Sequence, residues 1–215
     1  MKKLLLVAIA VLFVVPAASA AFSVYSWEDG GTVLGVYGNP EDPAYPAVIA
    51  TNVGAPDPVH SPTRSLKLVD NGNIAAGTTP QAYICHVYPL TDGDVVEACV
   101  WIYDTTPGAS PSGRIWAHYT GVGEDCEGYA GSAGGNSDYG PGTGWHQVCH
   151  TWVFDSDGGT RDGLCIHIRT YSLPGDTIWV DSLEVTHPDG TYACFPGCPS
   201  PVETQSWSLI KAMYR

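Results

Sequence analysis

The sequence is divided into short apolar segments by turn-forming residues, and this division most constrains the fold. The chain holds 25 Gly and 17 Pro among 215 residues, and only 14% of its residues are charged, so long helices account for little of it. No stretch before residue 203 has the period of an amphipathic helix. The sequence therefore predicts an all-β fold, an antiparallel β-sandwich of two packed sheets. The predicted strands are 22–27, 33–37, 47–53, 65–69, 82–88, 95–103, 114–120, 146–154, 164–171 and 177–186.

The first 20 residues have the pattern of a secretory signal peptide. Lys2 and Lys3 precede an apolar run at 4–15, and residues 18–20 read Ala-Ser-Ala, the small-x-small pattern that signal peptidase cleaves. The run is shorter than the roughly 20 residues that a membrane-spanning helix needs. We expect cleavage after Ala20 and a secreted or cell-surface protein. An uncleaved membrane anchor is the alternative.

The charge balance excludes two classes of partner. Acidic residues outnumber basic ones 22 to 9, and the formal net charge is −13. A protein that binds nucleic acid must neutralise phosphates with a basic patch, which this composition does not supply. The same excess of negative charge argues against docking on an anionic membrane.

Seven cysteines are expected to form disulfides, because export places the chain in an oxidising compartment. Cys194 and Cys198 are predicted to close a small loop. The pairs Cys149–Cys165 and Cys85–Cys99 follow if the turns between them close hairpins, but both fail if consecutive strands cross between sheets. An odd number leaves one thiol free or paired with another chain.

Alternation within three predicted strands, 95–103, 114–120 and 164–171, leaves aromatic and polar side chains facing away from the core. Flat aromatic rings suit the C–H face of a sugar, and planar polar groups suit its hydroxyls. The alternative is that these side chains only cover the sheet or pack under a loop. For Trp27, Trp145 and Trp152 we expect packing in the core or at a rim. A sugar site requires one continuous surface. The candidate ligand-binding residues are Trp101, Tyr103, Trp116, His118, His167, Arg169 and Tyr171.

Two segments stand apart from the predicted strands. Residues 121–144 include nine Gly in 24 positions, and we expect a long loop that is either the rim of a binding site or a mobile excursion. Residues 191–215 are predicted to be a Pro-rich linker and a tail. The tail is similar to Trp-x-x-Ile-Lys-x-x-Tyr-Arg endings on exported proteins of some uncultivated bacterial lineages, which implies sorting or attachment to the cell envelope. A helix that docks on its own sandwich is the alternative.

Five motifs occur in the order seen in jelly-roll carbohydrate-binding modules, and the chain resembles the group that contains families 4, 9 and 22. The resemblance spans about 22–187 and implies a jelly-roll domain, bounded here as 21–190, and a polysaccharide or glycan partner. The motifs are YSWEDG at 25–30, SLKL at 65–68, GWHQV at 144–148, LCIHIR at 164–169 and IWVDSLEV at 178–185.

The same resemblance implies a structural calcium ion. By position, its ligands are the carboxylates of Glu28 and Asp181, with backbone carbonyls near Gly30 and Lys67. The second acid that the family usually has after the last-strand Asp is replaced here by Ser182. The alternative is that both carboxylates are ordinary surface groups at strand ends.

The sequence gives little evidence of a catalytic site. A glycosidase needs two carboxyl groups held across the scissile bond, and the strand acids Glu97 and Asp104 have no partner at a fixed spacing. We therefore expect an exported, non-catalytic carbohydrate-binding module. A structural or adhesive surface protein is the alternative, and a glycoside hydrolase or polysaccharide lyase is a distant third.

Overall fold

The structure is a computed structural model of the chain. It describes residues 19–39, 42–71, 79–105, 113–136, 143–170 and 175–198, with only the backbone for 38–39 and 42–46. Most of the predicted signal peptide, residues 1–18, and the predicted tail from 199 onward lie outside the described residues, as does Tyr171. Within these ranges no helix is long and apolar enough to cross a membrane.

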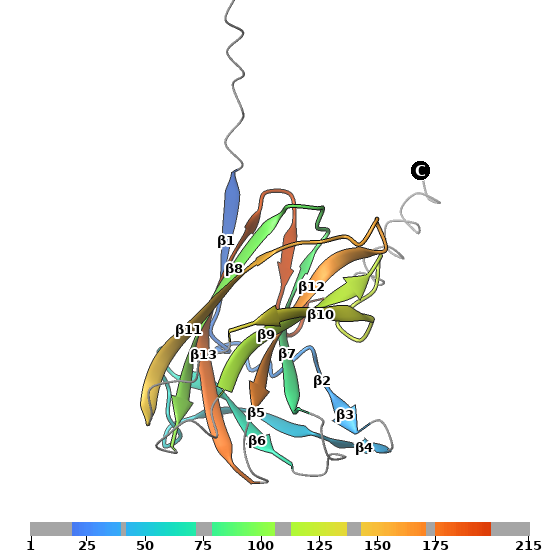
Figure 1. The fold of residues 1–215 in the computed structure, drawn as a ribbon. Helices are drawn as coiled ribbons and strands as arrows, with labels where there is room; N and C mark the ends of the chain where they lie inside the picture. Colours follow the sequence, from blue (N-terminus) through green and yellow to red (C-terminus); the bar gives the residue numbers. More distant parts are fainter. Residues whose placement is uncertain are drawn as a thin grey trace, which may run out of the picture.

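Two antiparallel sheets face each other and form a jelly-roll β-sandwich, as the sequence predicts (Figure 1). In the first sheet, called sheet A, the strand order is β11-β8-β13-β6-β5, and β1 also pairs with β13. In sheet B the order is β10-β9-β12-β7-β14, and β2 also pairs with β7. Sheet A contains β1 (Ala20–Tyr25), β5 (Val48–Gly54), β6 (Arg64–Asp70), β8 (Val95–Asp104), β11 (Gly144–Val153) and β13 (Thr177–Pro188). Sheet B contains β2 (Gly35–Val36), β7 (Gln81–Tyr88), β9 (Gly113–Gly121), β10 (Tyr129–Gly135), β12 (Arg161–Thr170) and β14 (Tyr192–Cys194), and a separate ribbon pairs β3 (Gly38–Asn39) with β4 (Asp42–Pro46).

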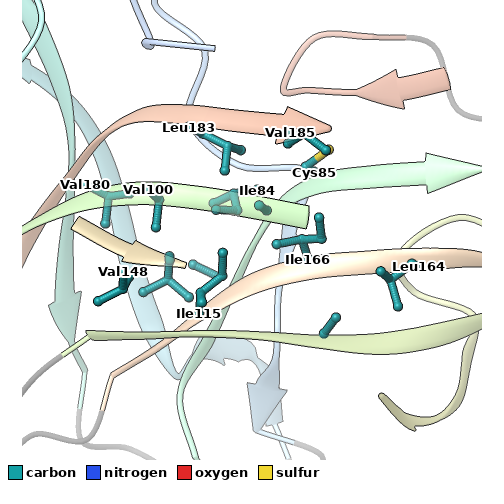
Figure 2. Packing of buried hydrophobic residues seen from close by; sticks show 14 of the residues in the cluster. Ile84, Cys85, Val100, Ile115, Val148, Leu164, Ile166, Val180, Leu183 and Val185 are labelled. Atoms are coloured by element: carbon teal, nitrogen blue, oxygen red, sulfur yellow. The ribbon is translucent and has the colours of Figure 1, made fainter. Parts of the chain in front are cut away.

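The core lies between the sheets and is built mainly from alternate residues of the long strands, although the consecutive residues Ile84 and Cys85 of β7 both belong to it (Figure 2). Val100 from β8 and Ile166 from β12 are fully buried, as are the residues two positions before and after them. Period-two alternation therefore identifies the inward faces of both strands correctly. Trp27 and Trp152 also belong to this core, as expected.

The disulfides follow from strands that cross between the sheets. β7 and β8 lie in different sheets, and so do β11 and β12, so the hairpin-based pairs Cys85–Cys99 and Cys149–Cys165 are wrong. Cys99 on β8 pairs instead with Cys149, its direct neighbour on β11. Cys126 pairs with Cys165 on β12. The Cys194–Cys198 loop is confirmed, and Cys85 is the odd thiol, buried in the core.

The structure differs from the sequence prediction in the Gly-rich segment and just beyond residue 190. Part of the Gly-rich segment forms β10, which pairs with β9 along the edge of sheet B. Gly135 permits this approach, because a Cβ there would lie 2.3 Å from the carbonyl oxygen of Ile115. The sandwich also continues beyond residue 190, because β14 pairs with β7 through Tyr192 and Cys194.

Candidate functional site

The predicted ligand-binding residues do not form one surface. Trp101 and Tyr103 lie on β8 in sheet A, whereas Trp116 and His118 lie on β9 in sheet B. His167 and Arg169, on β12, share the outer face of sheet B. Each residue points away from the core, as alternation predicts, but the two outer faces lie on opposite sides of the sandwich. The six described candidates therefore do not line together the one continuous groove that the glycan hypothesis requires.

The outer face of sheet A carries a row of aromatic rings, which we call the aromatic row: Trp145, Tyr103 and Trp179. They occupy directly paired positions on β11, β8 and β13. The ring of Tyr103 lies 5.4 Å from that of Trp145 and 5.8 Å from that of Trp179, edge to face in both cases. Trp145 and Tyr103 are half-buried, while Trp179 is only 9% exposed. The row therefore presents Trp145 and Tyr103 to solvent, with Trp179 packed beside them.

Trp101 extends this surface along β8. It lies two residues before Tyr103, and the imidazole of His60 stacks on it with 4.1 Å between ring centroids. His60 also contacts Trp145 edge to face at 5.4 Å. Sequence reasoning missed His60 and Trp179 and assigned Trp145 to packing. Trp179 stands between two apolar core residues, so the alternation used for β8 would have placed it outward.

The loop at 55–63, which joins β5 to β6, brings His60 over the sheet. Asp57 in this loop accepts a hydrogen bond from the indole N–H of Trp179 (3.1 Å). It also forms an ion pair with Lys67 (3.3 Å). The ammonium of Lys67 in turn lies 5.4 Å from the centroid of the Trp179 ring. These contacts cover Trp179, and His60 occupies one face of the Trp101 ring. The open part of the surface is therefore Tyr103, Trp145 and the remaining part of Trp101.

The two carboxylates assigned to calcium hold this loop. Asp181 is fully buried. Its carboxylate accepts hydrogen bonds from the backbone N–H groups of His60 (2.9 Å), Ser61 (2.7 Å) and Ser182 (2.7 Å). It also accepts one from the Ser61 hydroxyl (2.6 Å). Glu28 accepts the hydroxyl and N–H of Thr63 and the N–H of the next residue. The Thr63 hydroxyl, followed by its N–H, lowers the pKa of Glu28.

This arrangement does not fit a calcium ion. Calcium needs six to eight oxygen lone pairs directed at one centre, but here hydrogens of N–H and O–H groups are directed at the carboxylate oxygens. Lys67 lies on β6, which is paired on both sides, so its carbonyl belongs to the sheet ladder. No group of three or more His, Cys, Asp or Glu side chains in the described ranges could hold a metal. Whether a calcium ion binds at Glu28 and Asp181 is tested by the chelator experiment in the Discussion.

On the outer face of sheet B, a covering segment buries the predicted residues. Disulfide Cys126–Cys165 fastens residues 121–128 over the sheet, and the Cys126 carbonyl lies 3.0 Å from Nε2 of His118. His118 and His167 are 1% and 0% exposed, so neither is available to a ligand. Burial lowers the pKa of His118 to about 4 and that of His167 well below its usual range.

Trp116 and Arg169 remain partly open on this face. The Arg169 guanidinium lies 4.3 Å above the Trp116 ring and occupies one of its faces. Arg169 Nε also donates to His167 Nε2 (3.1 Å), and the Trp116 indole donates to the Ser132 hydroxyl (3.1 Å). These mutual contacts are those of side chains that cover a sheet, which was the alternative raised for them.

Comparison with known proteins supports the fold. No family model and no curated protein matches the sequence. Among solved structures, the chain is similar to the CBM22-1 xylan-binding domain of Xyn10C from Paenibacillus barcinonensis, with a TM-score of 0.52 and 12% identity over 80% of this chain and 97% of that one. The CBM22-2 domain of the same protein gives a TM-score of 0.50 and 16% identity over 77% and 98%. The apo BiXyn10A CBM1 module gives 0.50 and 12% over 77% and 96%.

These likenesses confirm the resemblance to jelly-roll carbohydrate-binding modules at the level of the fold. They cover almost the whole of each neighbour, so the likeness extends over the whole jelly-roll fold of these structures. The three disulfides agree with an extracellular protein. At 12–16% identity, a binding activity does not follow from the fold.

Proposed function

We propose that this protein is an exported, non-catalytic carbohydrate-binding domain and that it binds glycan on the outer face of sheet A. The observation that carries the proposal is the cluster of half-buried rings of Trp101, Tyr103 and Trp145 from two adjacent strands. Such a cluster offers flat apolar faces to successive sugar rings. Monomeric proteins keep exposed aromatic patches of this kind for binding.

Polar groups around the rings suit the hydroxyls of a sugar. His60 is exposed at the end of the surface, and Gln147 is exposed on β11, directly opposite Trp101. The Asp181 carboxylate beneath the loop fixes the position of His60 through its backbone N–H. The rings are therefore held before a ligand arrives, which reduces the entropy lost on binding.

A non-catalytic role agrees with the carboxylates near the aromatic row. Glycoside hydrolysis needs one carboxyl group that donates a proton and a second that acts as base or nucleophile. Asp57 is engaged by Lys67 and Trp179, and both oxygens of Asp181 accept hydrogen bonds from the protein. Neither is free to act on a sugar.

Affinity electrophoresis of the mature chain tests the proposal. Each gel contains either soluble xylan or one of a panel of other polysaccharides. Xylan is included because two of the similar structures are described as xylan-binding. Trp101→Ala and Tyr103→Ala should weaken binding about tenfold or more, since a central aromatic of a binding surface contributes about 1–2 kcal/mol or more. Trp116→Ala, on the opposite sheet, is the matched control and should bind normally.

Two results would overturn the proposal. One is the absence of retardation by every polysaccharide in the panel, which would favour a structural or adhesive protein. The other is equal loss of binding in the Trp116→Ala control and in Trp101→Ala, which would place the ligand elsewhere. Release of reducing ends during the assay would contradict the non-catalytic part alone.

A further inference from the structure

A small cavity lies on the opposite side of the sandwich from the proposed glycan surface. Its volume is about 120 Å³, and it is lined by Leu34, His86, Asp125, Glu127 and three disulfide-bonded cysteines, Cys126, Cys194 and Cys198. We call it the acidic pocket. Its walls come from β7, from the 121–128 segment and from the end of β14. It shares no residue with the aromatic row.

His86 lines this pocket and has an unpaired nitrogen. The residue is 1% exposed, and its Nε2 lies 3.0 Å from the hydroxyl of Thr120, while Nδ1 is buried without a hydrogen-bond partner. Gly163 leaves room for this pair, because a Cβ there would lie 2.4 Å from Nε2. Burial lowers the pKa of His86 to about 4, so the imidazole is neutral at pH 7. A buried polar atom without a partner is unfavourable, and a ligand that bonds to it removes that penalty.

Two carboxylates share the pocket without a balancing cation. Asp125 Oδ1 accepts the backbone N–H of Glu127 at 3.0 Å, so one tight turn carries both acids. Ion pairs in the described part of the chain involve Lys67 with Asp57 and Arg161 with Asp157, and none reaches the pocket. Burial, and then the neighbouring Asp125, raise the pKa of Glu127, which shows that its negative charge is disfavoured there.

We propose that the acidic pocket binds a small primary ammonium group. An ammonium has three N–H donors, and the pocket supplies acceptors on two carboxylates and on Nδ1 of His86 when Nε2 donates to Thr120. Leu34 and the disulfides give an apolar wall for the attached carbons. A cavity of about 120 Å³ has room for a ligand of a few heavy atoms. A metal ion is disfavoured, because no side-chain group in the described ranges could hold one.

Calorimetric titration of the mature chain with ethanolamine tests this proposal. Ethylene glycol is the neutral probe of the same size and should not bind. Glu127→Gln and Asp125→Asn remove one charge each at nearly constant volume, and Asn retains the oxygen that accepts the turn hydrogen bond. Each should weaken ethanolamine binding about tenfold, since a hydrogen bond to a charged group is worth about 1.5–3 kcal/mol. Glu124→Gln, in the same segment but outside the pocket lining, should bind normally.

Two further probes identify the source of the ammonium group. Glucosamine represents an amino sugar, and Nα-acetyl-lysine amide represents a protein side chain; the tighter ligand identifies the class. The nitrogen resonance of Nδ1 of His86 should shift on saturation with ethanolamine. Equal binding of ethylene glycol, an unchanged affinity in Glu127→Gln, an unmoved His86 resonance, or saturable binding of Ca²⁺ or Zn²⁺ without the amine would each overturn the proposal. Because the pocket shares no residue with the aromatic row, failure of ethanolamine to bind leaves the glycan proposal untouched.

Discussion

Acid should destabilise this protein at a pH where most exported proteins remain folded, because histidines are buried on sheet B. His86 and His118 are each 1% exposed, and burial lowers the pKa of both to about 4 from the ordinary value of 6.5. The folded state therefore keeps both imidazoles neutral where the unfolded chain is protonated. Stability is fully present above pH 6.5 and falls as the pH drops from there toward 4.

The size of the effect follows from the pKa difference. At pH 5 the unfolded chain gains about 2 kcal/mol per histidine relative to the folded state, at about 1.36 kcal/mol per pH unit below 6.5. The two histidines together remove about 4 kcal/mol, and His167, whose pKa is lowered further by burial, adds to the loss. A domain has a total stability of about 5–15 kcal/mol, so this loss is a large fraction of it.

Urea unfolding followed by tryptophan fluorescence measures the effect between pH 7.5 and 5. The free energy of unfolding should fall by about 4 kcal/mol or more across this range. In His118→Gln the fall should be smaller by about one histidine's share, whatever the absolute stability of the variant. A free energy that is constant over this pH range would refute the reasoning.

Further predictions concern the loop at 55–63 that Glu28 and Asp181 hold, the core thiol Cys85, and Gly135 at the sheet edge. A chelator should not change the melting temperature, because the oxygens of Glu28 and Asp181 are bonded to N–H and O–H groups; a drop of several degrees would restore the calcium ion. Asp181→Ala should leave the loop unanchored and increase acrylamide quenching of the tryptophans, and unchanged quenching would contradict the clamp. Cys85 should not react with Ellman's reagent until the chain unfolds, because it is buried and burial raises its pKa; rapid labelling of the native protein would contradict this. Gly135→Ala should destabilise the domain by about 1–3 kcal/mol, measured by urea unfolding, because the new methyl overlaps the carbonyl of Ile115; unchanged stability would show that β10 can shift at no cost.

The candidate site shows where sequence patterns stop being informative. Alternation correctly turns Trp101, Tyr103 and Trp116 away from the core, because the face of a strand residue depends only on its parity. Which side chains become neighbours depends on strand pairing, and Trp145 and Trp179 join Tyr103 through strands more than 40 residues away along the chain. No local pattern encodes that pairing.

The sequence by itself determined the all-β class, the inward faces of the long strands and the Cys194–Cys198 loop, because each depends on residues close together in the chain. Only the tertiary structure decided that β7 and β8 lie in different sheets, which separates Trp101 from Trp116 and changes the disulfide partners. It also decided that a disulfide-anchored segment buries His118. These features depend on contacts between distant segments, whose free energy comes from packing whole sheets together rather than from local conformational preference.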